Sequence, residues 1–270
     1  MGDSGTGDGN QYMVAALLER IQPSFLLHTG DVIYNAGAYA DFNPKYFTPY
    51  SRTLPSIPFF TSLGNHDVGT LNGQPYLDNF YLPSNNPLNS ERYYSFDYGN
   101  AHFVALDTNQ STSPGSEMYN WVQSDLAGTT KFWKFVFFHH ALYSSGPHSL
   151  DVLYLTRRND LSPLFAQYNV DVVFAGHDHD YERTFAIRDY APAGRGVMYI
   201  VTGGGGARRY DKIANNGWSA FFKSAFHAVK VSMGGCVLIL HAIEPPLDTV
   251  FDSFVINRCP PVVYLPVIWR

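Results

Sequence analysis

The feature that most constrains this chain is a set of short apolar segments that each end abruptly on a polar side chain. The segments span residues 25–29, 57–63, 134–138 and 170–175. Continuous apolar runs of this length, bounded by turn residues, are typical of buried strands. The polar residues that follow them are Asp31, Asn65, His139 and His177. Ligands of open α/β sheets bind beyond the carboxyl ends of the strands, so we expect these four side chains to share one rim.

Helices and strands alternate in the first part of the chain, whereas strands dominate after residue 196. Helical spacing predicts helices over residues 10–21, 115–126 and 161–168, and residues 70–100 resemble a long surface loop. Further strands are expected at residues 101–107, 197–202, 228–231, 237–243 and 249–256. This order predicts an α/β fold of two packed mixed β-sheets flanked by helices. We expect one catalytic domain over residues 1–258 and a C-terminal tail over residues 259–270.

Composition narrows the classes of ligand. The formal net charge is -5 at pH 7, which disfavours nucleic acid as a partner. No apolar run approaches the length of a membrane span, so we expect no membrane partner. Hydrophobic residues make up 45% of the chain and charged residues 15%, which indicates a folded core rather than a disordered chain.

The first residues raise a question about the first strand. Asp3 lies in a motif like those after the apolar segments, but only Met1 and Gly2 precede it. An interior strand missing before Asp3 would leave its neighbours without backbone partners. We therefore expect the domain to lack its first strand, and the natural chain to begin further upstream.

The only two cysteines, Cys236 and Cys259, flank two predicted strands that are joined around Pro245 and Pro246. Antiparallel pairing of these strands would bring the cysteines together at the open end of the hairpin. We hypothesise a disulfide, and with it an oxidising compartment; the alternative is a pair of free thiols.

The polar residues at the strand ends form a set of oxygen and imidazole donors without any thiolate. They lie in the sequences GDSG, GDVIY, GNHD, VFFHH and GHDH. The donors are Asp3, Asp31, Tyr34, Asn65, His139, His177 and His179. Such a mixture suits iron, zinc or manganese. It suffices for two ions if one carboxylate bridges them, and two ions roughly 3.5–4 Å apart can act on one phosphoryl group.

These five sequences, in this order, resemble the motif blocks of the metallophosphoesterase superfamily, from residue 2 to about residue 206. The tyrosine of GDVIY is similar to that of purple acid phosphatases. The resemblance implies that Asp31 bridges two ions. It also implies that Asp3, Tyr34 and His179 complete a ferric site, and that Asn65, His139 and His177 complete a divalent site for zinc, manganese or iron. The alternative for Tyr34 is an ordinary buried tyrosine.

The resemblance implies an acid phosphatase that cleaves phosphate monoesters by attack of a metal-bound hydroxide. The leaving alkoxide needs a proton, for which His66 is the first candidate and His148 the second; His148 could equally be an ordinary loop residue. The chain has GNHD where plant enzymes have GNHE, and His140 and Ala141 also depart from the plant pattern. These departures leave the substrate preference open.

Two other functions compete with this expectation. The first is a phosphodiesterase or nucleotidase of the same superfamily that uses a divalent pair, and Tyr34 argues against it. The second is an inactive homologue that binds a ligand or partner, and the presence of all seven donors argues against it. We expect a small phosphate ester as substrate and a secreted or periplasmic location.

Overall fold

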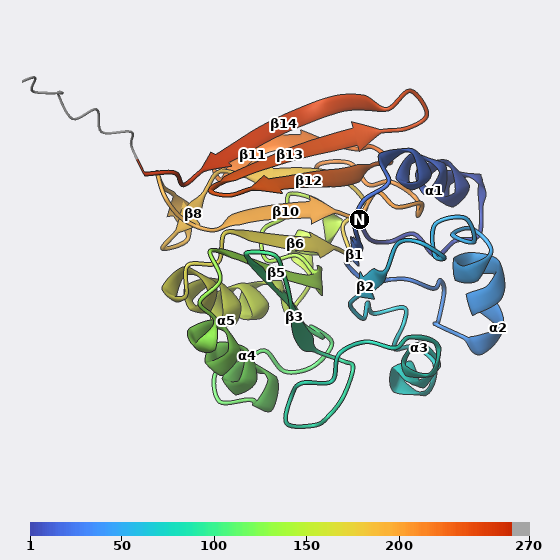
Figure 1. Ribbon diagram of the computed structural model, residues 1–270, viewed down its shortest axis with the longest axis horizontal. Coiled ribbons are helices and arrows are strands. Elements are labelled where there is room, and N and C mark those ends of the chain that lie inside the picture. The colour runs from blue at the N-terminus through green and yellow to red at the C-terminus, as the bar shows by residue number, and fades with distance from the viewer. Residues whose placement is uncertain (261–270) are drawn as a thin grey trace, which may run out of the picture.

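The computed structural model, which describes residues 1–260, is built around a seven-stranded mixed sheet (Figure 1). Its strand order is β11-β7-β10-β6-β5-β4-β3. The four central strands run parallel, and antiparallel strands flank them on both sides. The strands are β3 (Tyr94–Tyr98), β4 (Ala101–Ala105), β5 (Trp133–His140), β6 (Val172–Gly176), β7 (Tyr181–Thr184), β10 (Met198–Thr202) and β11 (Ser219–Lys223).

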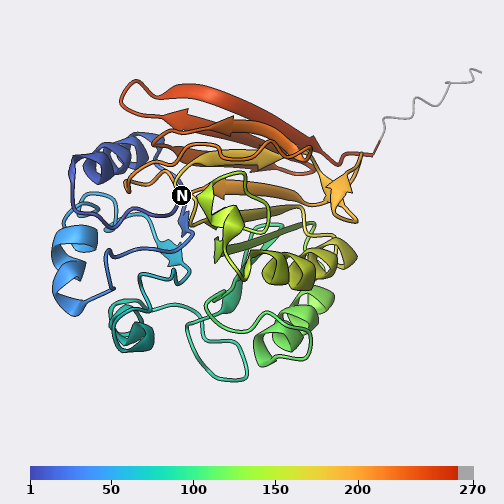
Figure 2. The ribbon, with the colours of Figure 1, turned by 180° about the vertical axis from the view of Figure 1, so that it is seen from behind.

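A second layer of strands covers one face of this sheet (Figures 1 and 2). It consists of a parallel pair and an antiparallel three-stranded ladder. These strands are β1 (Leu26–His28), β2 (Phe59–Thr61), β12 (Ala228–Gly234), β13 (Val237–Glu244) and β14 (Thr249–Asn257). The core between the layers includes Phe135 and Phe174 of the large sheet and Leu240 of the ladder. A small hairpin, β8 (Ile187–Arg188) and β9 (Ala191–Pro192), lies at the edge of the fold.

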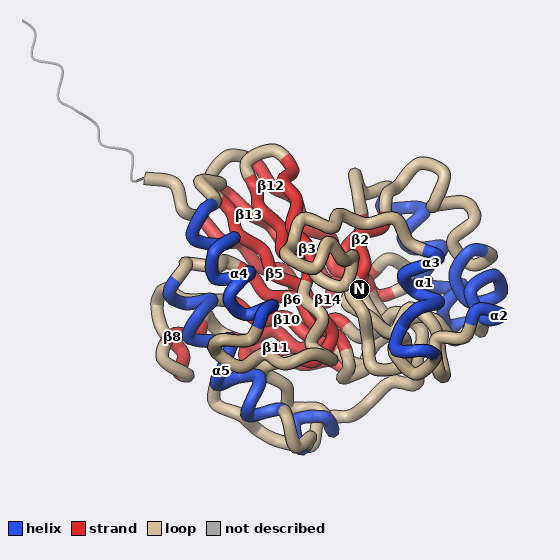
Figure 3. Tube along the Cα trace, turned by 90° about the horizontal axis from the view of Figure 1, so that it is seen from below, coloured by secondary structure: helices blue, strands red, loops and turns tan. Residues whose placement is uncertain are grey.

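Helices cover the opposite face and one end of the sheets (Figure 3). On the opposite face a second core packs α4 and α5 against the large sheet, and Val122, Val136 and Phe165 belong to it. Alternate residues of β5 point into the two cores, as the pleat of a strand requires. The helices are α1 (Gly9–Ile21), α2 (Tyr39–Phe42), α3 (Gln74–Asn79), α4 (Glu117–Gly128) and α5 (Tyr154–Gln167). The predicted fold of two packed sheets flanked by helices is therefore confirmed.

Local predictions differ from the structure in several places, and the short elements α2, β7, β8 and β9 were not expected. Residues 70–100, expected as one loop, contain α3 and β3. Helix α5 begins at Tyr154, seven residues before the expected start at residue 161. The prediction missed this first part because residues 156–160 are polar and no side chain caps the start of the helix. Strand β11 was not expected, since all five of its residues are only half-buried and it lies at the sheet edge. Most of the predicted tail, residues 261–270, lies outside the described residues.

The N-terminal residues lie between the two layers, at the carboxyl ends of the strands (Figure 2). The Met1 ammonium group donates to the Leu27 carbonyl oxygen at 3.1 Å, and the Thr29 amide donates to the Met1 carbonyl oxygen at 3.0 Å. The Gly2 amide donates to the Thr202 carbonyl oxygen at 2.8 Å. Burial lowers the pKa of the Met1 amino group to about 5. These bonds attach the segment to both layers and place Asp3 at the rim.

A cleft of about 540 Å³ separates β1 from β12, and apolar side chains such as Leu27, Phe135 and Val231 line it. Within residues 1–260, β1 and β12 are each paired with a strand on one side only. The parallel pair and the three-stranded ladder are therefore joined through the shared core rather than through backbone pairing.

The hypothesised disulfide is present. Cys236 and Cys259 are bonded, with their Cα atoms 5.0 Å apart. The bond ties the turn between β12 and β13 to the residue that follows β14, beside a hydrogen bond from the Arg258 amide to the Cys236 carbonyl oxygen. It thereby closes the open end of the β13–β14 hairpin. In the described part of the chain, no helix has the length and apolar character needed to span a membrane.

Candidate metal centre

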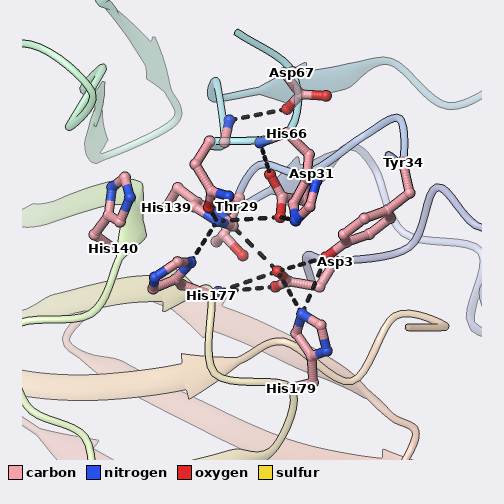
Figure 4. Close-up of polar contacts among 12 residues, drawn as sticks. Asp3, Thr29, Asp31, Tyr34, His66, Asp67, His139, His140, His177 and His179 are labelled. Carbon is pink, nitrogen blue, oxygen red and sulfur yellow. Dashed lines mark hydrogen bonds and ion pairs between the residues drawn. The ribbon is translucent and has the colours of Figure 1, made fainter. Parts of the chain in front are cut away.

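Six of the seven predicted donors meet at one rim, between the two layers of strands (Figure 4), and Asn65 joins them through its contact with His139. They come from five separate parts of the chain: the N-terminal segment, the loops after β1, β2 and β6, and the end of β5. Six of the seven are buried, with less than a tenth of each residue's surface exposed, and Asn65 is half-buried. The donors are Asp3, Asp31, Tyr34, Asn65, His139, His177 and His179. The strand ends therefore bring together the side chains that the sequence singled out.

Three of the donors form a tight triangle, called here the Tyr34 group. The Tyr34 hydroxyl oxygen lies 3.2 Å from Oδ1 of Asp3 and 3.0 Å from Nε2 of His179. The same Asp3 oxygen lies 3.5 Å from Nε2 of His179. Two oxygens and one nitrogen thus point at a common position.

Four donors converge around Nε2 of His139 and are called here the His139 group. Oδ1 of Asn65 lies 2.9 Å from this nitrogen, and Nδ1 of His177 lies 3.1 Å from it. Oδ2 of Asp31 lies 3.4 Å away. Two nitrogens bound tetrahedrally to one zinc ion, each at about 2.0–2.1 Å, stand roughly 3.3 Å apart. The spacing between His139 and His177 therefore suits a shared ion.

Asp31 connects the two groups. Its carboxylate belongs to the His139 group, while its charge also acts on Tyr34. One oxygen of Asp31, one of Asp3 and one nitrogen of His139 all lie within 4.8 Å of one another. A carboxylate in this position can reach ions held by both groups.

Two of the three imidazoles are anchored by backbone carbonyl groups, through the nitrogen that faces away from the centre. Nδ1 of His139 donates to the Thr29 carbonyl oxygen at 2.9 Å, and Nδ1 of His179 donates to the Arg208 carbonyl oxygen at 2.7 Å. Such outer acceptors fix the tautomer and ring orientation of a metal-binding histidine. The inner nitrogens of both rings are thereby left as acceptors for an ion.

The backbone at the site is unusual at the donors themselves. Asp3, Asp31 and His177 have φ values of 60°, 54° and 71°, which lie in the left-handed region that non-glycine residues rarely adopt. A Cβ on Gly64 would lie 2.0 Å from Oδ1 of Asp31, and one on Gly176 would lie 2.3 Å from Oδ2 of Asp3. The donors make the sharp turns, and these two glycines leave the space that the carboxylates occupy.

The ionisable side chains of the site shift one another's pKa values. Burial lowers the pKa of His139, but the Asp31 and Asp3 carboxylates outweigh this effect and raise the pKa to about 9. Burial raises the pKa of Asp31, but the charge of His139 and its hydrogen bond outweigh this effect and lower the pKa below its ordinary value. Burial, followed by the charges of Asp3 and Asp31, raises the pKa of Tyr34 well above its ordinary value. The buried carboxylates therefore provide a strong negative field, which a cation would neutralise.

The donor set fits iron, zinc or manganese, because it combines carboxylate, phenol, amide and imidazole groups without sulfur. The space beside the carboxylates supports the same conclusion, since a side chain at Gly64 or Gly176 would fill it. Candidate metal-binding groups are therefore present, and the chemistry of the residues is compatible with two ions.

The two candidate proton donors lie beside different donor groups. His66 is beside Tyr34, with ring centroids 4.5 Å apart, and its Nε2 is 3.9 Å from Oδ2 of Asp31. His148 stacks on His177, with ring centroids 3.8 Å apart. Their side chains are 36% and 30% exposed, so both can meet a substrate arriving from solvent.

Several neighbours of the donors were missed by the sequence reasoning. Tyr210 stacks on His179 with ring centroids 4.3 Å apart and planes 10° apart. Asp151 contacts both His148 and His177. Neither residue belongs to a motif, and Asp151 is an exposed loop residue. Thr29 and Arg208 act through backbone carbonyl groups, which no side-chain pattern can reveal.

Comparisons with known proteins identify the family of this chain. The family model described as calcineurin-like phosphoesterase matches residues 1–181. The chain is 29% identical over 239 residues to purple acid phosphatase 23 of Arabidopsis thaliana, covering 76% of this chain and 51% of that protein. It is 27% identical over 267 residues to a protein of the same plant named "Probable inactive purple acid phosphatase 1", covering 86% of this chain and 43% of that protein.

The fold is also similar to a solved structure. Purple acid phosphatase PPD1 from seeds of yellow lupin, Lupinus luteus, superposes with a TM-score of 0.86 at 24% sequence identity. The match covers 98% of this chain and 56% of the lupin chain. The chain spans about half the length of the curated relatives it matches.

Proposed function

Because the chain belongs to the calcineurin-like phosphoesterase family, we propose that it is a metal-dependent acid phosphatase that hydrolyses phosphate monoesters. The observation that carries this proposal is the convergence of two donor groups, with the Asp31 carboxylate of one group close to the Asp3 carboxylate of the other. One group contains a phenol and the other an amide, so the two positions are chemically distinct.

The seven donors would form two neighbouring metal sites. Asp3, Tyr34 and His179 would hold a ferric ion, Asn65, His139 and His177 would hold a divalent ion, and Asp31 would bridge the two. Bound metal ions supply Lewis-acid activation of the phosphoryl group and of the attacking water. The phenol of Tyr34 must lose its proton to bind the ferric ion, because only the phenolate is a strong ligand.

The exposed histidines would serve the leaving group. The ring of His66 donates from Nδ1 to the Asn35 carbonyl oxygen, which leaves its Nε2 directed toward Asp31 and the centre. A protonated Nε2 can transfer its proton to the departing alkoxide. His148 lies against His177 of the other donor group, where it can also contact the substrate.

The proposal of phosphate monoesters as the substrate class rests on Tyr34. A phenolate combines with a trivalent ion and distinguishes this centre from a pair of divalent ions, which is the alternative expected of a phosphodiesterase. A second alternative, a binding protein without activity, is raised by the relative that is named inactive. We propose a small phosphate ester as substrate. Because the chain contains a disulfide, we also propose an oxidising, extracytoplasmic location.

One experiment separates these three functions. Metal-free protein is loaded with ferric iron and zinc, and hydrolysis of 4-nitrophenyl phosphate and bis(4-nitrophenyl) phosphate is measured across pH. We expect the monoester to be hydrolysed faster, with the maximum below pH 7. Preference for the diester by a protein loaded with zinc alone would favour the phosphodiesterase. Two bound ions without turnover of either ester would favour the binding protein.

A further inference from the structure

His177 differs from the other two predicted imidazole ligands in what lies behind its ring. His139 and His179 are anchored by neutral backbone carbonyl groups. Nε2 of His177 instead lies 2.9 Å from Oδ2 of Asp151. A hydrogen bond to a carboxylate is stronger than one to a carbonyl group, because the acceptor is charged.

The inner side of the same ring faces the centre. Nδ1 of His177 lies 3.1 Å from Nε2 of His139, within the His139 group. A neutral imidazole carries one proton, so one ring nitrogen donates while the other accepts. An acceptor at Nε2 therefore selects the tautomer in which Nδ1 offers its lone pair to an ion.

Asp151 also reaches the second proton donor. The same Oδ2 lies 3.2 Å from Nδ1 of His148. The backbone fixes this arrangement, because the Asp151 amide donates to the His148 carbonyl oxygen at 3.0 Å. The Asp151 carbonyl oxygen in turn accepts from the Tyr154 amide at 3.0 Å, at the start of α5. One carboxylate thus contacts a predicted ligand and a predicted acid.

We propose that Asp151 is a positioning residue of the metal centre. Its carboxylate holds His177 with Nε2 protonated and Nδ1 aimed at the divalent position, and it orients His148 beside that position. The inference rests on the proposed metal centre but not on the identity of the substrate. Carboxylates behind metal-binding histidines typically change metal affinity by roughly 10–100-fold.

The main alternative is that His148, Asp151 and His177 hold an ion of their own, since donor atoms of all three lie within 4.8 Å of one another. The exposure of Asp151 and His148 favours a positioning role for Asp151 over a role as metal ligand. The Asp151 side chain is 41% exposed and that of His148 is 30% exposed, whereas Asp3, Asp31 and His139 are fully buried. A tightly bound ion is expected among the buried donors, which water competes for least.

The test replaces the carboxylate by a group of the same shape, Asp151→Asn. A matched control is Asp211→Asn, which removes an exposed carboxylate that makes no hydrogen bond or ion pair within residues 1–260. Zinc affinity is measured without substrate, by competition with a chromogenic chelator. We expect Asp151→Asn to bind zinc 10–100-fold more weakly with an unchanged number of ions at saturation, and Asp211→Asn and His148→Ala to match the wild type.

A second measurement reports on the ring itself. Nitrogen NMR of labelled, metal-free protein should show His177 in the Nε2–H tautomer, and Asp151→Asn should shift it toward a mixture of tautomers. Wild-type affinity and an unchanged tautomer in Asp151→Asn would overturn the proposal. Loss of one bound ion in both Asp151→Asn and His148→Ala would also overturn it, because these side chains would then be ligands. A protein that shows the expected zinc affinities but no hydrolysis would refute only the proposed function.

Discussion

The Tyr34 hydroxyl oxygen lies 3.0 Å from Nε2 of His179, and the Asp3 carboxylate completes the triangle. Burial and the charges of Asp3 and Asp31 keep Tyr34 a phenol in the absence of metal, since they raise its pKa well above the ordinary value. A phenolate can therefore form here only when a cation compensates its charge. This requirement makes Tyr34 a direct reporter of the ion beside it.

We predict that adding ferric iron to the metal-free protein releases protons and produces a violet or pink colour. A phenolate bound to ferric iron absorbs visible light by charge transfer, so Tyr34→Phe should bind iron without the colour. Visible spectroscopy with iron analysis measures both effects. A colourless, iron-free but fully active enzyme would show that the ferric assignment is wrong and would favour a divalent pair.

Replacing His66 should separate catalysis from metal binding. His66 is partly exposed and lies outside both donor groups, so His66→Ala should retain both ions and reduce turnover by roughly 10²–10⁴-fold, as expected for loss of a general acid. Asn65→Ala, one residue away, should instead empty the divalent position. Metal analysis and single-substrate kinetics distinguish the two variants. Loss of metal from His66→Ala would contradict the assignment.

Gly64 provides a test of the space around Asp31. A Cβ at this position would lie 2.0 Å from Oδ1 of Asp31, so Gly64→Ala should displace the carboxylate and weaken binding at both positions. Gly128→Ala is the matched control, because a Cβ there meets no atom within 4 Å. Affinity for zinc should fall by at least 10-fold in the first variant and stay unchanged in the second. Equal affinities would mean that the loop relaxes freely.

His102 should make stability depend on pH. It is buried between Asp125 and Asp97, at 2.7 Å and 2.8 Å. Burial lowers the pKa of His102, but hydrogen bonds to Asp125 and Asp97 outweigh it and raise the pKa above the ordinary value. The stabilisation is therefore complete below the unfolded pKa of about 6.5 and is lost as the pH rises through the folded pKa.

The measurement compares the wild type with His102→Gln in metal-free form. We expect the free energy of unfolding of the wild type to exceed that of His102→Gln by about 1 kcal/mol more at pH 5.5 than at pH 9, as for a partly buried charged pair. A difference independent of pH would show that His102 contributes through packing alone.

Removing the disulfide should cost stability without touching the site. Cys236 and Cys259 are 23 residues apart, and closing a loop of this length stabilises the fold by about 3 kcal/mol in the chain-entropy model. Cys236→Ser combined with Cys259→Ser should lower the free energy of unfolding by this amount and leave zinc affinity unchanged. Alkylation of two thiols in the unreduced native protein would contradict the bond itself.

The sequence predicted the strand ends well, because apolar runs such as residues 170–175 are buried on both faces and end on a glycine. For the same reason it predicted that the polar side chains after these strands share one rim; their role as metal ligands stays a prediction. It missed β3, although YSFDY alternates as a strand does, because the surrounding residues 70–100 are rich in turn-forming residues. It missed the start of α5 because residues 156–160 are all polar. It also missed Asp151 and the Thr29 carbonyl group, because their role depends on which ring nitrogen they face, and only the folded chain determines that.

The seven candidate donors come from five stretches of chain, from Asp3 to His179. At least one helix and one strand separate each stretch from the next, so the site forms only when the whole domain is folded. Occupancy of the centre is therefore thermodynamically linked to the cooperative unfolding of the whole domain. Each tenfold excess of an ion over its dissociation constant adds about 1.4 kcal/mol to the free energy of unfolding. A chelator in the buffer should consequently lower the melting temperature of the metal-loaded protein, as a destabilising mutation in a distant core would.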